Sequence, residues 1–373
     1  MHINQQSTRV VEVTSYLAPL TNASGLGGIT AENPITGLSM LASTRIPLGV
    51  LCSFALMLQS ASPAKPVRAR IAFASHRDGN WEIYVTDGDG AHQTRLTRRD
   101  AQDRFPLWSP DLTKIAFGSQ LPNDWDLWVM NADGSQPRRL CSHIVAKGFR
   151  QWSPDGRRIA LAARVDGDIE IFTVDVADGR LTRLTNSPGD DRDPTWSPDG
   201  SQIAFSSVRY GNTAIYVMRA DGTGLRRVTN DPAEDVSPAW SPDGSTIAFA
   251  SGVGEDRDLF VIRLADGRRE RLTTGARVTK DVSRWSPDRA YVAIQTADKG
   301  NYDIQLVRMV DHVRTAVAAS AGYDGQFSWS SDGRRLAFIS DRDGYDAVYV
   351  TDVTGAHVRR VTTTASLNPE WEP

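Results

Sequence analysis

Residues 192–207 read RDPTWSPDGSQIAFSS, and residues 236–251 read VSPAWSPDGSTIAFAS, 44 positions later. The same sequence pattern recurs along the chain, and each copy contains one tryptophan at a fixed position. Consecutive marker tryptophans are separated by 44, 44, 44, 45, 44 and 42 residues: Trp108, Trp152, Trp196, Trp240, Trp285, Trp329 and Trp371. A period of this length is typical of a β-propeller, in which each repeat forms one four-stranded blade.

The local pattern within one copy supports four short strands. In the copy around Trp196, apolar and β-branched residues gather in PTW, QIAFSS, AIYVMR and LRRVT. The connections between them are SPDG, RYGN and ADGTG, in which Pro, Asp and Gly favour tight turns. No helical period competes within the repeat, so the sequence predicts an all-β fold.

The two ends of the repeat region predict how the ring closes. The first IAF-type strand, at Ile71, has no WSP strand before it, and the last tryptophan, Trp371, has no such strand after it. The C-terminal strand should therefore complete the first blade, which gives a seven-bladed propeller of four-stranded blades. A six-bladed ring is the alternative, because the sixth copy is weak and has Arg289 where the turn glycine is expected.

The N-terminal region differs from the repeats. Residues 46–58, IPLGVLCSFALML, form a short apolar run that follows Arg45 and precedes QSASPAKP, a pattern typical of a secretory signal. We therefore expect residues 1–39 to be a disordered or mis-annotated extension, residues 40–64 a signal peptide, and residues 65–373 the propeller. A buried N-terminal helix and a lipoprotein anchor at Cys52 are the alternatives. The run is too short to cross a membrane as a helix.

Composition narrows the classes of partner. The net charge is −3 and the basic residues are scattered among acidic ones, which argues against nucleic acid. The two cysteines, Cys52 and Cys141, have no neighbour at metal-ligand spacing, and Cys141 is interpreted as a small apolar strand residue. The histidines of the repeat region, His76, His92, His143, His312 and His357, fall at differing repeat positions. We expect no metal, no cofactor and no catalytic group.

Candidate binding residues lie before the marker tryptophans. An acid recurs about five residues before the tryptophan, where the chain should enter the innermost strand at the mouth of the central channel. These acids are Asp103, Asp191, Asp235, Asp281 and Asp324, and Lys147 takes the place in the third copy. Converging carboxylates would attract a cationic group such as a basic peptide. The alternative is that each aspartate accepts backbone amides within its own turn.

The repeat D.DP.WSPDG..IAF.S...G...IYVM.ADG...RLT resembles the TolB-type β-propeller family and covers residues 68–373. The resemblance implies an exported, periplasmic or secreted scaffold that binds a protein, peptide or polymer, with an envelope or transport role. The family pattern has an α/β domain and six blades, whereas here the repeats start directly and number seven. We expect a monomeric binding protein, and the resemblance implies association with the cell envelope. A propeller enzyme that acts on polysaccharide, similar to oligogalacturonate lyases, or on peptide is the alternative.

Overall fold

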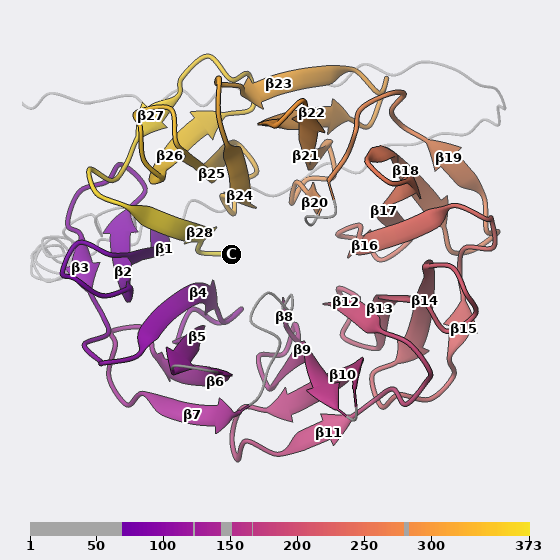
Figure 1. Ribbon diagram of the computed structural model, residues 1–373, viewed down its shortest axis with the longest axis horizontal. Coiled ribbons are helices and arrows are strands. Elements are labelled where there is room, and N and C mark those ends of the chain that lie inside the picture. The colour runs from indigo at the N-terminus through magenta and orange to yellow at the C-terminus, as the bar shows by residue number, and fades with distance from the viewer. Residues whose placement is uncertain (1–68, 122–123, 143–150, 166, 280–282) are drawn as a thin grey trace, which may run out of the picture. The chain divides into compact units, whose positions relative to one another are not determined.

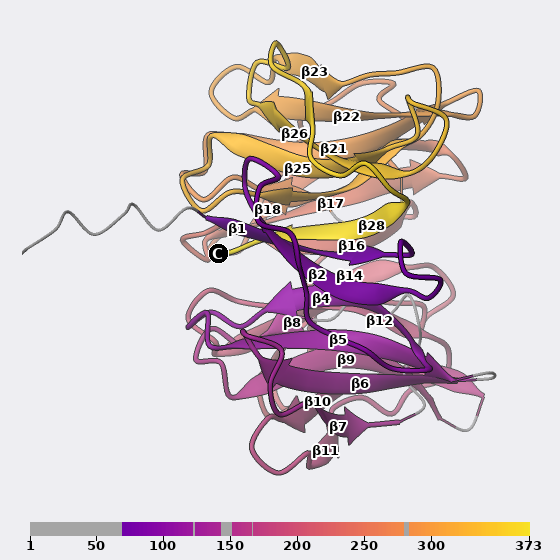
Figure 2. The same cartoon turned by 90° about the vertical axis from the view of Figure 1, so that its left-hand side faces the viewer.

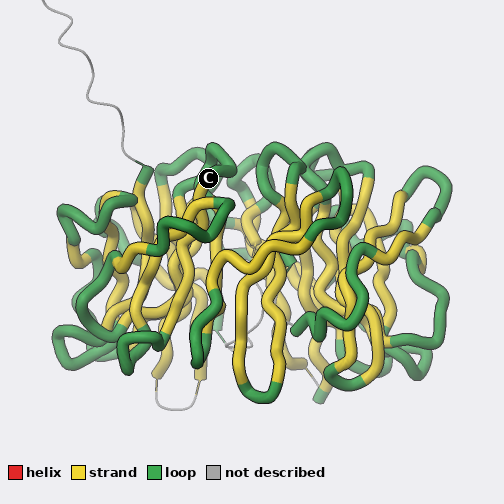
Figure 3. Tube along the Cα trace, turned by 90° about the horizontal axis from the view of Figure 1, so that it is seen from above, coloured by secondary structure: helices red, strands yellow, loops and turns green. Residues whose placement is uncertain are grey.

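The structure, a computed structural model, describes residues 69–121, 124–142, 151–165, 167–279 and 283–373. The chain divides into two units, Met1–Ala64 and Lys65–Pro373. The predicted extension (1–39) and signal peptide (40–64) lie outside the described residues. Every regular element in the described ranges is a β-strand, and none of them is a helix (Figure 3).

The strands form seven sheets of four antiparallel strands, arranged around a common axis in Figure 1. The first three strands are β1 (Arg70–Ser75), β2 (Glu82–Asp87) and β3 (Thr94–Arg95). The second and third sheets are β4 (Gln102–Trp108), β5 (Lys114–Leu121), β6 (Asp124–Asn131), β7 (Arg138–Cys141), and β8 (Gln151–Trp152), β9 (Arg158–Val165), β10 (Asp168–Asp175), β11 (Leu181–Arg183). The fourth and fifth are β12 (Asp191–Trp196), β13 (Gln202–Ser207), β14 (Ala214–Arg219), β15 (Arg226–Arg227), and β16 (Glu234–Trp240), β17 (Thr246–Val253), β18 (Asp256–Arg263), β19 (Arg269–Arg271). The last two are β20 (Arg284–Trp285), β21 (Tyr291–Asp298), β22 (Asn301–Arg308), β23 (Arg314–Ala318), and β24 (Asp324–Trp329), β25 (Arg335–Ser340), β26 (Ala347–Asp352), β27 (Arg359–Arg360).

The C-terminal strand closes the ring. Strand β28 (Ser366–Trp371) pairs antiparallel with β1, with Ile71 opposite Trp371, and completes the sheet β28-β1-β2-β3. Figures 1 and 2 both show β28 beside β1. The prediction of seven blades closed by the C-terminal strand is confirmed, and the six-bladed alternative is wrong. The weak sixth copy forms a complete blade, β20 to β23.

Apolar side chains of the second and third strands pack between neighbouring blades. Phe73 and Trp371 of the first blade, for example, share a buried cluster with Val348 of the last blade. Burial of one such large side chain contributes about 1.5–3 kcal/mol, so the seams between blades hold the ring together. The marker tryptophans add direct links across four seams, because the indole N–H donates to a backbone carbonyl of the preceding blade. These bonds join Trp152 to Leu107, Trp240 to Thr195, Trp285 to Ala239 and Trp329 to Arg284, at 3.1–3.2 Å.

The recurring SPDG segment is a structural turn. In the copy at Trp196, the Ser197 hydroxyl donates to Asp199 at 2.5 Å and accepts the backbone N–H of Gln202 at 2.9 Å. The fourth residue, Gly200, has φ of 70°, a left-handed conformation that glycine adopts without steric cost. Leu112 and Arg289 occupy the same turn position in two other copies, with φ of 59° and 64°. The turn geometry therefore persists even where glycine is absent.

Candidate functional site

Four of the five predicted acids lie at the start of innermost strands. Asp191 and Asp324 are the first residues of β12 and β24, and Asp103 and Asp235 are the second residues of β4 and β16. Each side chain is fully buried. Each of the four stands opposite a serine of the adjacent strand in its blade: Ser207, Ser340, Ser119 and Ser251. Asp281 and Lys147 lie outside the described residues.

An arginine neutralises Asp191 within its own blade. Both Asp191 carboxylate oxygens accept from Arg209, at 2.9 and 3.1 Å, and the Ser187 hydroxyl donates at 3.1 Å. Arg209 also donates to Ser207 at 2.8 Å and stacks 4.8 Å from the ring centre of Tyr216. The charge of Asp191 is therefore held by a guanidinium and a hydroxyl, which are side-chain groups rather than the backbone amides of a turn.

The blade of β24 repeats this arrangement with different residues. Arg342 donates to Asp324 at 2.9 Å and to Ser340 at 2.8 Å. Its guanidinium lies 4.9 Å from the ring centre of Tyr349 and 5.4 Å from that of Phe338. A buried carboxylate, a guanidinium and an aromatic pair thus form one layered unit in both blades. Stacking of arginine on aromatic faces is favourable when the guanidinium is desolvated.

The arginine near Asp235 comes from the outermost strand of its blade. Arg269 of β19 donates to Ser251 at 2.6 Å, lies 3.6 Å from the Asp235 carboxylate, and stacks 4.1 Å from the ring centre of Phe260. Burial raises the pKa of Asp235, and the Ser251 and Thr229 hydroxyls oppose that effect. The arginine is therefore retained in this blade although its position in the chain has changed.

Asp103 is the least compensated of the four. Burial raises the pKa of Asp103 to about 6, and the Ser119 hydroxyl and the Arg99 charge oppose this only in part. Arg99 stacks 3.5 Å from the ring centre of Trp128. Because burial penalises the charged form of an acid, Asp103 titrates closer to neutrality than an ordinary aspartate.

Sequence reasoning missed the arginines, although a signal for three of them exists. Arginine follows the second-strand serine by two positions in Ser75-His76-Arg77, Ser207-Val208-Arg209 and Ser340-Asp341-Arg342. In the first of these blades Ser366 stands where the acid would be, and Arg77 still stacks 4.4 Å from the ring centre of Tyr84. The Ser-x-Arg pattern therefore marks the stacked unit, whether or not an acid is present.

Five of the innermost strands carry a bulge that redirects one side chain in each. Pairing with the second strand shifts register at this point, and the bulged residue has φ between 47° and 56°. These residues are Phe105, Asp193, Ser237, Gln326 and Asn368. A bulge re-aims side chains and often occurs beside functional sites. Asn368 donates from its side chain to Gln326 of the neighbouring blade at 2.9 Å.

An ion pair also links innermost strands that are not adjacent. Arg284 of β20 lies 3.2 Å from Glu370 of β28, and the blade of β24 stands between these two strands around the axis (Figure 1). Burial raises the pKa of Glu370, and the Arg284 charge opposes the shift. This pair therefore connects the blade of β20–β23 with the C-terminal strand of the closing blade.

The face that carries the loops between second and third strands exposes apolar side chains. Tyr210, in the connection from β13 to β14, and Val253, at the end of β17, are each 74% exposed. Tyr345, in the connection from β25 to β26, is 37% exposed. Exposed apolar side chains that share one face are available for contact with a partner.

The described histidines take part in separate interactions. His92 and His357 pair with Asp87 and Asp352 across the turns between third and fourth strands. Those two histidines occupy equivalent positions in their blades, so the expectation of differing repeat positions is wrong for them. His312 lies 3.6 Å from Glu270 and His76 packs edge-on against Trp81, whereas His143 lies outside the described residues. Among the described residues, no cluster of three or more His, Cys, Asp or Glu side chains is arranged to hold a metal ion.

The sequence matches the family of the TolB beta propeller domain over residues 142–234 and 234–373. The match covers more than half of the chain, and the protein belongs to this family of TolB-type β-propellers. A search of curated proteins gave no match. In the part of the chain that the structure describes, no helix has the length and hydrophobicity needed to cross a membrane.

Three solved structures illustrate the range of proteins with this architecture. TolB from Acinetobacter baumannii is 18% identical, with a TM-score of 0.56, and the match covers 82% of this chain and 67% of that one. Oligogalacturonate lyase from Vibrio parahaemolyticus is 15% identical, with a TM-score of 0.64, and coverage of 76% and 86%. A puromycin-hydrolyzing peptidase from Mycobacterium tuberculosis is 16% identical, with a TM-score of 0.61, and coverage of 81% and 55%. At these identities the likeness establishes the fold, which is shared by proteins of different function.

Proposed function

We propose that this protein is an exported propeller scaffold that binds a protein, peptide or polymer partner at the channel mouth. Its role would be TolB-like, in the cell envelope or in transport, and its location periplasmic or secreted. Family membership and the signal-like segment at residues 40–64 support this proposal. The observation that carries the binding role is the exposure of Tyr210 and Val253 on the face of the loops between second and third strands.

The five acids, Asp103, Asp191, Asp235, Asp281 and Asp324, remain part of this proposal as the acids of the rim. The four described ones are buried, so we assign them an indirect role in binding. Asp191 and Asp324 hold Arg209 and Arg342 against the aromatic pairs, and both arginines lie within the loops between second and third strands. A partner would then contact the loops, whose position depends on the acids.

Affinity capture from an envelope extract tests the binding role. The wild-type protein is compared with a loop-face variant, Tyr210→Ser with Val253→Ser. The matched control changes two exposed apolar residues at turns on the opposite face, Leu225→Ser with Val310→Ser, which are 43% and 85% exposed. We expect a specific protein or polymer that the wild type and the control retain and the loop-face variant loses.

Two outcomes would contradict the proposal. Equal retention by the loop-face variant and the control would show that the exposed residues Tyr210 and Val253 do not contact the partner. Absence of any retained partner, together with turnover of an acidic polysaccharide or a peptide by the purified protein, would favour the enzyme alternative. Fractionation of cells that express the full chain tests export separately, since retention in the cytoplasm would contradict an exported location.

A further inference from the structure

The seam between the blade of β16–β19 and the blade of β20–β23 lacks a side chain that the other seams contain. The first residue of the second strand is Thr246 in this blade. In the other six blades the same position holds a longer side chain: Arg70, Lys114, Arg158, Gln202, Tyr291 and Arg335. The short threonine therefore leaves space at one seam out of seven.

Three of the other six seams show an arginine in this space. The guanidinium at this position lies over the marker tryptophan of the next blade, 4.6–4.8 Å from the ring centre. The pairs are Arg70 with Trp108, Arg158 with Trp196, and Arg335 with Trp371. Arg158 also donates to the backbone oxygen of Ala220 in the next blade, at 3.2 Å. The face of the marker tryptophan is thus a stacking surface for guanidinium groups in this protein.

A second arginine is also replaced at the same seam. In the blades of β7 and β27, Arg138 and Arg359 of the fourth strand donate to backbone oxygens of the next blade, at Val176 and Gly88. Strand pairing places Glu270 at this position in β19, because Glu270 stands opposite Val261 as Arg359 stands opposite Val350. A carboxylate therefore occupies a site from which arginine elsewhere reaches across the seam.

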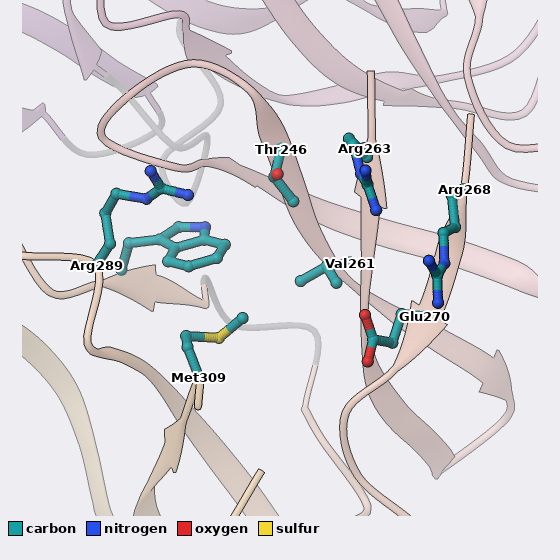
Figure 4. Close-up of a pocket in the computed structure, with 8 residues that line it drawn as sticks. Thr246, Val261, Arg263, Arg268, Glu270, Arg289 and Met309 are labelled. Atoms are coloured by element: carbon teal, nitrogen blue, oxygen red, sulfur yellow. The ribbon is translucent and has the colours of Figure 1, made fainter. Parts of the chain in front are cut away.

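The two replacements leave a pocket of about 170 Å³ on the face of the SPDG turns. Thr246, Val261, Trp285 and Met309 form its less polar wall, and Glu270 lines it together with three arginines: Arg263, Arg268 and Arg289. Figure 4 shows Glu270 beside Arg268 at one side of the pocket and Met309 at the other. Trp285 lines the pocket, and its indole N–H donates to the backbone oxygen of Ala239 at 3.1 Å, which holds the ring in place.

We propose that this pocket binds a guanidinium group, supplied by an arginine side chain of a partner polypeptide or by free arginine. The guanidinium would stack on Trp285 as the internal arginines stack on Trp108, Trp196 and Trp371. Its N–H groups would donate to the Glu270 carboxylate, since charge-assisted hydrogen bonds are the strong ones. The ligand would thereby make the contacts that three other seams make with their own arginines.

The charges around the pocket are compatible with a cationic ligand. Arg289 is paired with Asp243 at 2.5 Å, and Arg263 lies 3.6 Å from Asp266. Glu270 lies 3.6 Å from the imidazole of His312, which is longer than a hydrogen bond, so the carboxylate oxygens of Glu270 can accept from a ligand. Arg268 also lines the pocket, next to Glu270, and its positive charge could attract a small anion instead. The experiment below therefore includes a small anion as a competing ligand.

Isothermal titration calorimetry of the full chain with N-acetyl-arginine-N-methylamide tests the proposal. We expect saturable binding of this compound and none of the uncharged citrulline analogue of the same shape. Thr246→Arg should abolish the binding, because the new guanidinium would fill the pocket from within, and should raise the melting temperature by about 1–3 °C. Glu270→Gln should weaken binding about tenfold while leaving the melting temperature unchanged.

Two further ligands are titrated: free L-arginine, to identify the source of the guanidinium, and N-acetyl-glutamate, as the competing anion. Tighter binding of free arginine than of the blocked compound would identify the free amino acid as the source of the guanidinium, and the reverse would identify a polypeptide. Binding of N-acetyl-glutamate without binding of either arginine compound would overturn the proposal. Equal binding of the blocked arginine by the wild type and by a folded Thr246→Arg variant would overturn it as well. If Thr246→Arg does not fold, an unchanged affinity in Glu270→Gln is the result that overturns the proposal.

Discussion

The carboxylate of Asp191 lies 2.9 Å from the guanidinium of Arg209, and both side chains are buried, at 0% and 9% exposure. The two residues come from the first strand and from just after the second strand of one blade, and Arg209 also lies against Tyr216. An acid that the repeat places at the rim is thus already paired within the fold. This pairing decides how substitutions at the rim acids should be interpreted.

Asp191→Asn should destabilise the protein by about 3–5 kcal/mol, because it leaves the Arg209 charge buried without its partner. The double variant Asp191→Leu with Arg209→Met should be clearly more stable than Asp191→Asn, because it removes both charges. Urea unfolding at pH 7 measures both effects. Equal stability of Asp191→Asn and the wild type would show that the pair contributes nothing to the fold.

Asp103→Asn should have the opposite effect at neutral pH. The pKa of Asp103 is raised by burial to about 6 from 3.8, so the folded state binds more protons than the unfolded chain between these values. The contribution of Asp103 to stability is therefore complete below pH 4 and is lost as the pH rises through 6. Asparagine does not ionise, so Asp103→Asn should exceed the wild type by up to about 3 kcal/mol at pH 7 and by nothing at pH 4.

The measurement is the free energy of unfolding of both proteins from pH 4 to pH 8. Arg99→Gln provides a control, because removal of the neighbouring positive charge should raise the pKa of Asp103 further. A stability difference between Asp103→Asn and the wild type that does not vary with pH would contradict the assignment.

Leu112→Gly should stabilise the protein by about 1 kcal/mol. Leu112 has φ of 59° at the turn position that Gly200 occupies with φ of 70°, and a side chain is disfavoured in this conformation. The reverse change, Gly200→Leu, should cost a similar amount. Thermal unfolding of the two variants checks the prediction, and a loss of stability in Leu112→Gly would mean that the side chain packs usefully in the turn.

Trp371→Ala should open the seam at which the two ends of the propeller meet. Trp371 is 1% exposed and packs with Phe73 in the closing blade, so its removal should cost about 3–5 kcal/mol. Leu225→Ala, at a position that is 43% exposed, should change stability by less than about 0.5 kcal/mol. Chemical denaturation compares the two variants. A small effect of Trp371→Ala would indicate that ring closure contributes little to the stability of the folded unit.

The blade architecture could be predicted because its signals are local and repeated. The SPDG turn depends on residues close in the chain, as the contacts of Ser197 with Asp199 and Gln202 show. Six copies of that turn, including variants such as SPDL and SPDR, fix the strand order. The missing first strand at Ile71 and the extra one at Trp371 fix the closure.

The candidate site was only partly predictable, because it depends on contacts between residues far apart in the chain. The recurrence of Asp103, Asp191, Asp235 and Asp324 is visible in the sequence, but their burial is not. Arg269 reaches Asp235 from a strand 34 positions later in the numbering, and no local pattern indicates that contact. A carboxylate at a fixed repeat position can therefore be paired or uncompensated, according to which neighbour the fold supplies.

The sequence by itself determined the number of blades, the strands and turns within each blade, and the closure by the C-terminal strand. Only the tertiary structure decided that Asp191 is neutralised by Arg209, that Asp103 is left poorly compensated, and that Thr246 opens a pocket over Trp285. The physical reason is that the repeated residues specify turns and strand pairing within one blade, and these involve residues close together in the chain. Charge compensation and side-chain packing depend on which residues meet within a blade and across a seam. These residues differ from one copy of the repeat to the next.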